Sequence, residues 1–399
     1  MKILAVNIAF RNENFYKRWR LLASNYNLNV HLVGPKYYKY ELIGKPLIFK
    51  PEAVNEESFK VSHIDMKKRI RNDWFSLKFL RLLIKFRPDI IYLLGLETQN
   101  AVFLSYFYKI FFNRKTKIGL FSMRGTKMPL NRFEFKWRWH YTKKIFDFIN
   151  LHYPYGKEIF EQQAYYKGPI QLQTQIGVDK DVYFKSEERR QKIRDRHDIN
   201  KDEFVFCSAS RVDEIKGVFD IVTACKHMSN KKFRFFMLGD GKDYEKIKLE
   251  IEKHNLMDII ITPGMIENGI PVAEYLAASD CFVHVPHTTK KWVDTFPLAV
   301  VQAMATKLPV IGSDSGAVPY QLGDNGFIVC EKNVKDLVSK MSFVINNKAK
   351  SLSKGLKLYN RAMTCFEIRS LNNFLFQTFK AIYFNQPSKI IKDQIYLDE

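Results

Sequence analysis

The residues that could do chemistry are densest from Trp292 to Gly316, a segment that reads WVDTFPLAVVQAMATKLPVIGSDSG. Within it Asp294 and Gln302 are eight positions apart, and Pro297 stands where a helix begins. Because the fixed φ of proline suits a helix start, we expect Asp294 in the loop before the helix and Gln302 a little over one turn inside it. Both side chains can then face a ligand above the helix N-terminus, where free N–H groups and the helix dipole favour a diphosphate.

Strands and amphipathic helices alternate through the whole chain, and this pattern must position those residues. In the first half the apolar runs Lys2–Ala9, Asn29–Gly34 and Asp89–Leu94 predict strands. In the second half Phe204–Ala209 begins a new series of strands and helices. The later strands are expected at Arg234–Leu238, Ile259–Thr262, Cys281–Val285, Pro309–Ile311 and Phe327–Val329. Such alternation is typical of parallel sheets covered on both faces, so the predicted fold class is α/β with two Rossmann-like domains.

Length and composition indicate two domains. A chain of 399 residues is too long for one ordinary core, and its 46% hydrophobic content can fill two. The charged run Asp179–Asp198 has no strand signal and is the expected linker. Ile368–Tyr383 has the pattern of an amphipathic helix after the final strand.

The segment from Trp292 to Gly316 resembles the donor-binding signature of retaining GT-B glycosyltransferases of the family-4 type (glycosyl transferases group 1), usually written Glu-x(7)-Glu. In this chain Asp294 stands at the first acidic position, Gln302 at the second, and Tyr320 at a third acidic position of the family. Further matches follow in the family's order: Ile176–Asp179 (IGVD), Ser210–Gly217 (SRVDEIKG), Leu238–Lys242 (LGDGK) and Tyr275–Asp280 (YLAASD). The resemblance covers roughly residues 170–340 well and the first half in outline.

The resemblance implies the GT-B fold, in which two Rossmann-like domains face each other across a cleft. Residues 1–182 would form the acceptor domain and residues 183–365 the nucleotide-sugar donor domain. A C-terminal helix within residues 366–399 would cross back to pack on the N-terminal domain.

The resemblance also implies the roles of single residues. Arg211 and Lys216 would neutralise the donor's diphosphate, and Asp294 would reach the donor sugar, so these three are the expected catalytic residues. Gln302 would hold the ribose hydroxyls. The remaining expected donor contacts are Gly239, Met265, Thr295, Phe296, Pro297 and Leu298.

These side chains also have ordinary structural interpretations. Arg211 and Lys216 can be surface charges on a strand-to-helix loop, and Gln302 can be a solvated helix residue. In the N-terminal domain Glu97 and Arg124 are the polar residues best placed to face the cleft, without a motif to support them.

The sequence predicts neither a metal nor a cofactor besides the nucleotide sugar as co-substrate. Asp179-Lys180-Asp181 matches the D-x-D metal motif of another glycosyltransferase fold, but it follows a turn instead of ending a strand. No other spacing suggests a metal site.

The implied reaction is sugar transfer from a nucleotide-sugar donor to a glycan or lipid-linked acceptor, with retained anomeric configuration. Such a hexosyl- or related glycosyltransferase would serve cell-surface polysaccharide biosynthesis. Three alternatives stay open: a same-fold nucleotide-sugar epimerase, a donor-binding homologue with impaired turnover, and a basic nucleic-acid-binding protein. The last would need a recognition helix or RNP-like aromatics, and we find neither in the sequence, so we expect no nucleic-acid partner.

Positive charge is concentrated in the first half of the chain. Residues 1–150 contain 29 Lys and Arg against 11 Asp and Glu, whereas the remainder contains 35 against 31. This asymmetry predicts an anionic partner, such as a phosphorylated acceptor or an anionic membrane surface; a lysine-rich solubilising surface is the alternative. The five scattered cysteines, the absence of a signal-peptide pattern and the absence of a long apolar run predict a cytoplasmic protein. The charge asymmetry predicts that it is peripheral on the inner face of the membrane.

Overall fold

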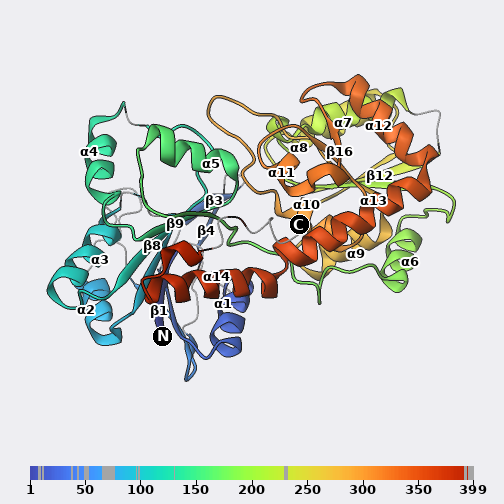
Figure 1. The fold of residues 1–399 in the computed structure, drawn as a ribbon. Coiled ribbons are helices and arrows are strands. Elements are labelled where there is room, and N and C mark those ends of the chain that lie inside the picture. Colours follow the sequence, from blue (N-terminus) through green and yellow to red (C-terminus); the bar gives the residue numbers. More distant parts are fainter. Residues whose placement is uncertain are drawn as a thin grey trace. The chain divides into compact units, whose positions relative to one another are not determined.

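The computed structural model describes residues 1–7, 10, 13–36, 39–42, 45–48, 54–64, 77–95, 97, 99–129, 131–228, 232–390 and 393. The chain divides into two compact units (Figure 1). Unit 1 comprises Met1–Gln175 and Arg369–Leu397, and unit 2 comprises Ile176–Ile368. The first boundary therefore lies before the expected one, which followed residue 182.

Unit 1 is built on an eight-stranded sheet with the order β10-β9-β8-β7-β1-β2-β6-β5. Its strands are β1 (Lys2–Val6), β2 (Asn29–Pro35), β5 (Val54–Asn55), β6 (Phe59–Ile64), β7 (Ile90–Leu94), β8 (Lys117–Ser122), β9 (Phe148–Leu151) and β10 (Ile170–Leu172). All neighbours pair in parallel except β5, which runs antiparallel to β6. A separate hairpin consists of β3 (Lys39–Leu42) and β4 (Lys45–Ile48). The predicted first strand extends to residues 8 and 9, which lie outside the described residues.

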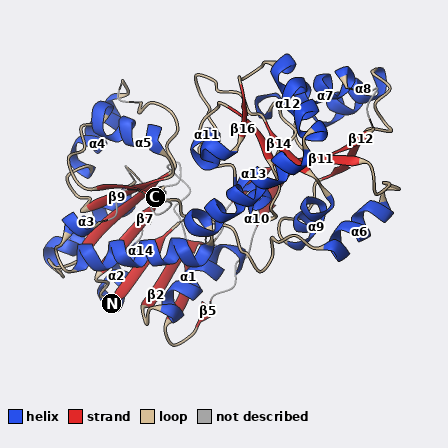
Figure 2. Cartoon of the chain, turned by 45° about the vertical axis from the view of Figure 1, so that its right-hand side comes forward, coloured by secondary structure: helices blue, strands red, loops and turns tan. Residues whose placement is uncertain are grey.

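Helices cover both faces of this sheet (Figure 2). They are α1 (Glu13–Asn25), α2 (Leu77–Phe86), α3 (Asn100–Phe111), α4 (Phe133–Thr142), α5 (Pro154–Glu158), which continues as the π-turn η1 (Ile159–Gln163), α14 (Ile368–Tyr383) and the short η5 (Pro387–Lys389). Successive residues of β1 point to opposite faces: Leu4 packs in one core with α2 and α3, and Ala5 packs in the other with α1 and α14. A strand buried on both faces must be apolar throughout, as the run ILAV is.

The C-terminal helix α14 belongs to the core of unit 1. Leu375 and Phe379 are buried there, and Thr378 Oγ1 donates to Gln171 Oε1 at 2.7 Å. Arg18 of α1 is buried beneath the helix and donates to Asn372 Oδ1 at 2.8 Å. Burial lowers the pKa of Arg18 to about 10. Because the buried guanidinium has little access to water, these contacts must satisfy its N–H groups.

Unit 2 is a second Rossmann-like unit with an all-parallel six-stranded sheet of order β13-β12-β11-β14-β15-β16. Its strands are β11 (Phe204–Ala209), β12 (Phe233–Leu238), β13 (Ile260–Gly264), β14 (Cys281–His284), β15 (Val310–Ser313) and β16 (Phe327–Val329). Its helices are α6 (Glu187–Arg196), α7 (Val218–His227), α8 (Tyr244–Lys253), α9 (Ile270–Ala278), α10 (Leu298–Ala305), α11 (Val318–Leu322), α12 (Val334–Asn346) and α13 (Lys348–Arg361), with short turns η2 (Glu214–Lys216), η3 (Gly323–Asn325) and η4 (Ala362–Phe366). The predicted α/β class with two Rossmann-like domains is confirmed.

The sheet of unit 2 is also covered on both faces (Figure 2). On β12, Phe235 packs in a core with α7, α8 and α12, whereas the next residue, Phe236, contacts Tyr275 of α9 with ring centroids 5.0 Å apart. Since all the strands are parallel, the loops after their carboxyl ends gather at one edge of the sheet, where ligands bind in such folds.

The chain passes from unit 1 to unit 2 and back through two segments that pair with each other. Val178 N–H donates to Phe366 O at 2.9 Å, and Ile368 N–H donates to Val178 O at 3.1 Å. The two ends of unit 2 are therefore hydrogen-bonded neighbours. In the part of the chain that the structure describes, no helix is both long and apolar enough to cross a bilayer.

Candidate functional site

The strand order of unit 2 creates a switch point beside β11 and β14. These two strands are neighbours, but the chain continues from β11 to β12 on one side and from β14 to β15 on the other. The loops that leave them therefore diverge and leave room for a ligand at the carboxyl edge of the sheet. The expected diphosphate residues, Arg211 and Lys216, follow β11, and Asp294 follows β14.

A glycine lets these two loops approach each other. Gly217 has φ +72°, and a Cβ atom there would lie 2.0 Å from Val285 O, so no larger residue fits without displacing the β14 loop. His287 N–H donates to Ile215 O at 2.9 Å across the same contact. The turn η2 is thereby fixed against the loop after β14, and its last residue, Lys216, is directed towards that loop.

Lys216, Asp294 and His284 form a buried polar cluster. Lys216 Nζ lies 2.6 Å from Asp294 Oδ2, and His284 Nε2 lies 3.1 Å from the same oxygen. Lys216 Nζ also stands 4.5 Å from the ring centroid of Trp292. Asp294 and His284 are buried, and the side chain of Lys216 is 12% exposed. The interpretation of Lys216 as a surface charge is therefore wrong.

The cluster keeps Asp294 ionised. Burial alone would raise the pKa of Asp294, but the hydrogen bond from His284 and the charge of Lys216 outweigh it and lower the pKa to about 2. Burial lowers the pKa of His284, so the imidazole is neutral at pH 7. Because an ionised carboxylate can only accept, the proton of His284 sits on Nε2 and points at Asp294. The result is one net-neutral ion pair supported by a neutral histidine.

The loop after β15 holds the backbone of Asp294. Ala317 N–H donates to Asp294 O at 2.9 Å. A Cβ atom at Gly316, where φ is +56°, would lie 2.2 Å from the same oxygen. The small residues after β15 thus allow a close approach that larger residues would prevent.

Gln302, on α10, lies in a second hydrogen-bonded network, in which Gln302 and Tyr183 are buried and Asn268 is exposed. Gln302 is 4% exposed, so its interpretation as a solvated helix residue is wrong. Its Nε2 donates to Tyr183 Oη at 2.9 Å and to Asn268 Oδ1 at 3.0 Å. Tyr183 Oη in turn donates to Asn268 Oδ1 at 2.7 Å and accepts from Gly269 N–H at 3.0 Å. Both protons of the Gln302 amide are therefore used inside the protein, and its Oε1 is the atom that can serve a ligand.

The sequence patterns did not predict Tyr183 and Asn268 as partners of Gln302. They are 119 and 34 positions from Gln302, and no motif includes either residue. The one available signal was the position of Tyr183 shortly after the IGVD turn at residues 176–179.

The other expected donor residues lie along the same sheet edge. Arg211 is exposed, with Nη1 3.7 Å from Asp213 Oδ2. Gly239 follows β12 and donates its N–H to Gly264 O at 2.9 Å, and Met265, directly after β13, is 67% exposed. Four residues remain: Thr295, Phe296, Pro297 and Leu298.

These four residues connect Asp294 to α10. Thr295 and Leu298 are partly exposed, whereas Phe296 is buried against Phe366 with ring centroids 5.6 Å apart. Pro297 is the cap residue before α10, which begins at Leu298, so the expectation that proline occupies the first helical position is off by one residue. The first turn of α10 therefore directly follows the loop that carries Asp294.

In unit 1 the structure brings Glu97 and Arg124 together. They form an ion pair, in which Arg124 Nε lies 3.2 Å from both carboxylate oxygens of Glu97, and Ser122 Oγ donates to the same carboxylate. These residues follow the carboxyl ends of β7 and β8, which are neighbouring strands near the switch point beside β1. Each is thus the main partner of the other.

Among the described residues no group of three or more His, Cys, Asp or Glu side chains is arranged to hold a metal. Near the crossing into unit 2, the D-x-D motif serves a turn: Asp179 Oδ1 accepts from Asp181 N–H at 3.0 Å. In the polar cluster of unit 2, the cation beside Asp294 Oδ2 is the ammonium of Lys216.

Comparison with known proteins gives one family match and several relatives. Residues 189–362 match the family described as "Glycosyl transferases group 1". The chain is 26% identical over 275 residues to an uncharacterized glycosyltransferase of Methanocaldococcus jannaschii. The aligned segment covers 65% of this chain and 63% of that protein. It is 28% identical over 157 residues to N-acetyl-alpha-D-glucosaminyl L-malate synthase of Bacillus anthracis, which covers 39% and 38%. The matches therefore span less than two thirds of these relatives.

Among solved structures, the chain resembles Alr3699/HepE of Anabaena in complex with UDP-glucose. The TM-score is 0.71 at 15% identity, over 96% of this chain and 100% of that one. At this level of identity the likeness shows a shared fold.

Proposed function

Because the chain carries a glycosyl transferases group 1 domain at residues 189–362 and has the GT-B fold, we propose that it is a retaining glycosyltransferase. It moves a hexosyl or related sugar from a nucleotide-sugar donor to a glycan or lipid-linked acceptor. The observation that carries this proposal is the placement of Arg211, Lys216 and Asp294 on the two loops that diverge from β11 and β14. The UDP-glucose in the HepE complex supports a nucleotide sugar as the donor.

Arg211, Lys216 and the start of α10 would bind the donor's diphosphate. An ammonium group has three N–H donors, and Asp294 takes one, so Lys216 can still donate two hydrogen bonds to phosphate oxygens. Arg211 is exposed and can turn towards the same group. The N–H groups of the first turn of α10 add a partial positive charge. Together they stabilise the charge that develops on the diphosphate as the bond to the sugar breaks.

Asp294 would orient the donor sugar. Lys216 and His284 both contact Oδ2, and Oδ1 can accept a hydrogen bond from a sugar hydroxyl. The acceptor hydroxyl would attack the anomeric carbon on the face from which the diphosphate leaves, and a diphosphate oxygen would take the hydroxyl's proton. The step is therefore balanced without a metal, a second cofactor or a covalent sugar–enzyme intermediate.

Gln302 would accept hydrogen bonds from the ribose hydroxyls through Oε1, while Tyr183 and Asn268 hold its Nε2. A neutral acceptor binds a hydroxyl less strongly than a carboxylate does, so the affinity for donor would be lower than with glutamate at this position.

The acceptor would bind to unit 1, which carries most of the positive charge. The Glu97–Arg124 pair offers it an ordered donor and acceptor of hydrogen bonds. We place the reaction in cell-surface polysaccharide biosynthesis, with the protein in the cytoplasm and peripheral on the inner face of the membrane. A lipid-linked phosphorylated acceptor would fit both the charge and that location.

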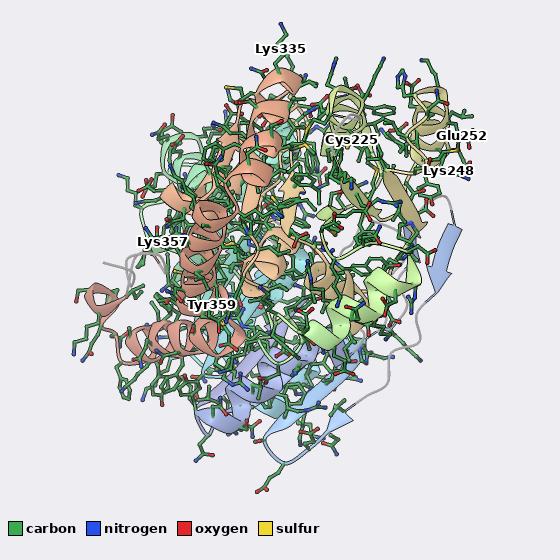
Figure 3. The ribbon with its side chains drawn as sticks, turned by 90° about the vertical axis from the view of Figure 1, so that its right-hand side faces the viewer. Cys225, Lys248, Glu252, Lys335, Lys357 and Tyr359 are labelled. Atoms are coloured by element: carbon green, nitrogen blue, oxygen red, sulfur yellow. The ribbon has the colours of Figure 1, made fainter. Side chains whose placement is uncertain are left out.

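The test begins with a thermal-shift screen of nucleotide sugars, followed by product analysis with the best donor. Lys216→Ala and Arg211→Ala should each lower turnover by about 10²-fold or more, because each removes a contact that strengthens in the transition state. Lys248→Ala is the matched control, since that lysine lies on the outer side of α8 (Figure 3).

Each unfavourable outcome has its own meaning. Near-normal turnover of both variants would remove the diphosphate assignment. Isomerised donor without an acceptor would indicate an epimerase, and an inverted product would exclude retention. Donor binding without any product would indicate a homologue that has lost turnover at positions 294, 302 and 320.

A further inference from the structure

Two helices of unit 1, α3 and α4, present large aromatic side chains to solvent. On α4 Phe133, Trp137 and Tyr141 are spaced four residues apart, so they form one stripe, and they are 82%, 52% and 48% exposed. The second half of α3 and the residue after it expose five more apolar side chains: Tyr106, Phe107, Ile110, Phe111 and Phe112. We call these eight side chains the aromatic face. Single exposed apolar residues are ordinary, but a contiguous group of this size marks an interaction surface.

A surface hollow connects the two helices. It has a volume of about 300 Å³ and is lined by Phe103, Tyr106, Trp137, Tyr141, Lys144 and Ile145. Tyr106 comes from α3, and Trp137 and Tyr141 come from α4, so the stripes of the two helices meet there. Trp139, which points the other way from α4, is buried in the core and fixes the helix on the sheet. The exposure of Trp137 is therefore set by the fold.

The same region is almost free of acidic residues. Residues 100–145 contain eleven Lys and Arg and one acid, Glu134, which pairs with Arg138 at 3.5 Å. Exposed cations lie on α4 and next to both helices in the sequence, and Lys144 lines the hollow itself. They are Arg114 and Lys115 after α3, and Arg132, Lys136 and Lys144 in and around α4.

We propose that the aromatic face docks on the surface of a bilayer that contains anionic lipid. Tryptophan and tyrosine favour the boundary of headgroups and acyl chains, where the ring is sheltered and its polar atom stays hydrated. Lysine and arginine around them attract anionic headgroups. The charge complementarity excludes a basic partner, and the density of exposed rings distinguishes this face from a merely solubilising surface, which would expose lysine without them. The face is built from unit 1 alone, so the inference does not depend on the transfer reaction proposed for unit 2.

The experiment measures sedimentation of the full chain with vesicles, without nucleotide or acceptor. The chain should bind vesicles of phosphatidylcholine mixed with phosphatidylglycerol, bind weakly to phosphatidylcholine alone, and bind less as salt is raised. The double variant Lys136→Glu/Lys144→Glu should weaken binding by about tenfold or more, because two attractive charges become repulsive. Phe133→Ser/Trp137→Ser should weaken it as well, and the loss should persist at low salt because it is apolar.

Helix α13 of unit 2 provides the matched control. It exposes Leu352 and Leu356, at 49% and 51%, beside Lys350 and Lys357, and Figure 3 shows Lys357 projecting from its outer side. Lys350→Glu/Lys357→Glu makes the same charge change elsewhere, and Leu352→Ser/Leu356→Ser removes two exposed apolar side chains there. We expect both variants to bind vesicles as the unchanged chain does.

A second readout locates the contact. Lipids with brominated acyl chains should quench the tryptophan fluorescence of the bound chain, and Trp137→Phe should remove much of that quenching while binding persists. Far-ultraviolet circular dichroism checks that every variant folds.

Three results would overturn the proposal. The first is no sedimentation with acidic vesicles at low salt. The second is an equal loss of binding in the α13 variants, which would make the effect one of overall charge. The third is a dimer in solution that Phe133→Ser/Trp137→Ser dissociates, which would identify the aromatic face as an interface of two copies of this chain.

Discussion

Asp294 shares one carboxylate oxygen, Oδ2, with Lys216 and His284, and this arrangement makes the stability of unit 2 depend on pH. The pKa of Asp294 is about 2, below its ordinary value of 3.8. A carboxylate with a lowered pKa stabilises the fold fully when the pH is above its ordinary pKa. This contribution to the free energy of unfolding disappears as the pH falls through the lowered pKa. For this shift the full contribution is about 2 kcal/mol, and about half of it is lost by about pH 3.

We therefore predict that Asp294→Asn makes the stability of unit 2 less sensitive to acid. The measurement is denaturant unfolding at about pH 6 and about pH 3, for the unchanged chain and the variant. Because the carboxylate raises the pKa of His284, the comparison is made in a His284→Gln background, where the glutamine amide can still donate to Asp294. There the Asp294→Asn variant starts less stable but should lose about 1 kcal/mol less over this range, since other carboxylates titrate equally in both proteins. An identical loss would mean that Asp294 titrates normally.

Substitutions in the network around Gln302 test whether its hydrogen bonds to Tyr183 and Asn268 hold its side chain in place. Tyr183→Phe removes one acceptor of the Gln302 amide and should cost about 1–3 kcal/mol, with weaker donor binding. Asn268→Asp keeps the oxygen that accepts from Tyr183 and Gln302, so it should be tolerated.

Gln302→Glu should also be tolerated, because the amide of Asn268 can turn its nitrogen towards the new carboxylate. The double variant Asn268→Asp/Gln302→Glu places two carboxylates together, and it should lose more stability than the sum of the single changes. Thermal unfolding of the unchanged chain, the two single variants at positions 268 and 302 and the double variant measures the coupling between these positions. Additive effects would contradict the hydrogen bond between Asn268 and Gln302.

Spacing and resemblance singled out Asp294, Lys216 and Gln302, but they did not predict how these residues are used. The Lys216–Asp294 pair arises from two loops 78 positions apart that pack at one sheet edge, which no local pattern encodes. The burial of Gln302 likewise depends on Tyr183, which approaches from before the first strand of unit 2. Motifs identify residue types, whereas tertiary packing decides which of them become partners.

At the scale of the elements, the loop after β11 depends on one backbone conformation. Gly217 and Gly95 have nearly the same φ, +72° and +74°, but a Cβ atom would meet Val285 O at 2.0 Å in the first case and nothing within 4 Å in the second. A comparison of the two glycines therefore distinguishes the cost of a left-handed backbone from the cost of a steric clash.

Gly95→Ala should cost about 1–2 kcal/mol, which is the ordinary penalty for a left-handed alanine. Gly217→Ala should cost clearly more and should also weaken donor binding, because the β14 loop that carries Asp294 must move. Unfolding curves and nucleotide-sugar calorimetry measure both effects. Equal losses of stability in the two variants would show that the β14 loop moves away from residue 217 without a measurable loss of stability.

The alternation of strands and helices predicted the main elements well, since a parallel sheet requires apolar strands separated by amphipathic helices. It did not predict the sheet order, because β11 and β14 are neighbours with three helices and two strands lying between them in the chain. That order places the switch point beside the candidate site. The alternation also gave no sign of the hairpin β3–β4, which lies outside both main sheets.

At the scale of the whole molecule, unit 1 is completed by a helix from the far end of the chain. Leu375 and Phe379 of α14 fill a core that includes Tyr92 and Phe148, whose ring centroids lie 5.4 and 6.2 Å from that of Phe379. Removal of all residues after Ile368 would expose this core and leave the buried Arg18 without Asn372.

We predict that this truncated chain retains the donor affinity of unit 2 but unfolds in unit 1. Limited proteolysis should cut residues before 176 and spare those after it. A chain that ends at Ile390 keeps α14 and is the control. Equal resistance of both truncated chains would mean that α14 contributes little to unit 1.

The position of α14 also sets the order in which the protein can fold as it is made. Translation delivers the whole of Ile176–Ile368 before α14 leaves the ribosome. Although domains generally fold in the order of synthesis, here the second unit has all its residues first, and the earlier one must wait for its last helix. During that interval the apolar surface around Tyr92 lacks its cover, so the nascent chain offers chaperones a binding surface that the finished protein no longer has.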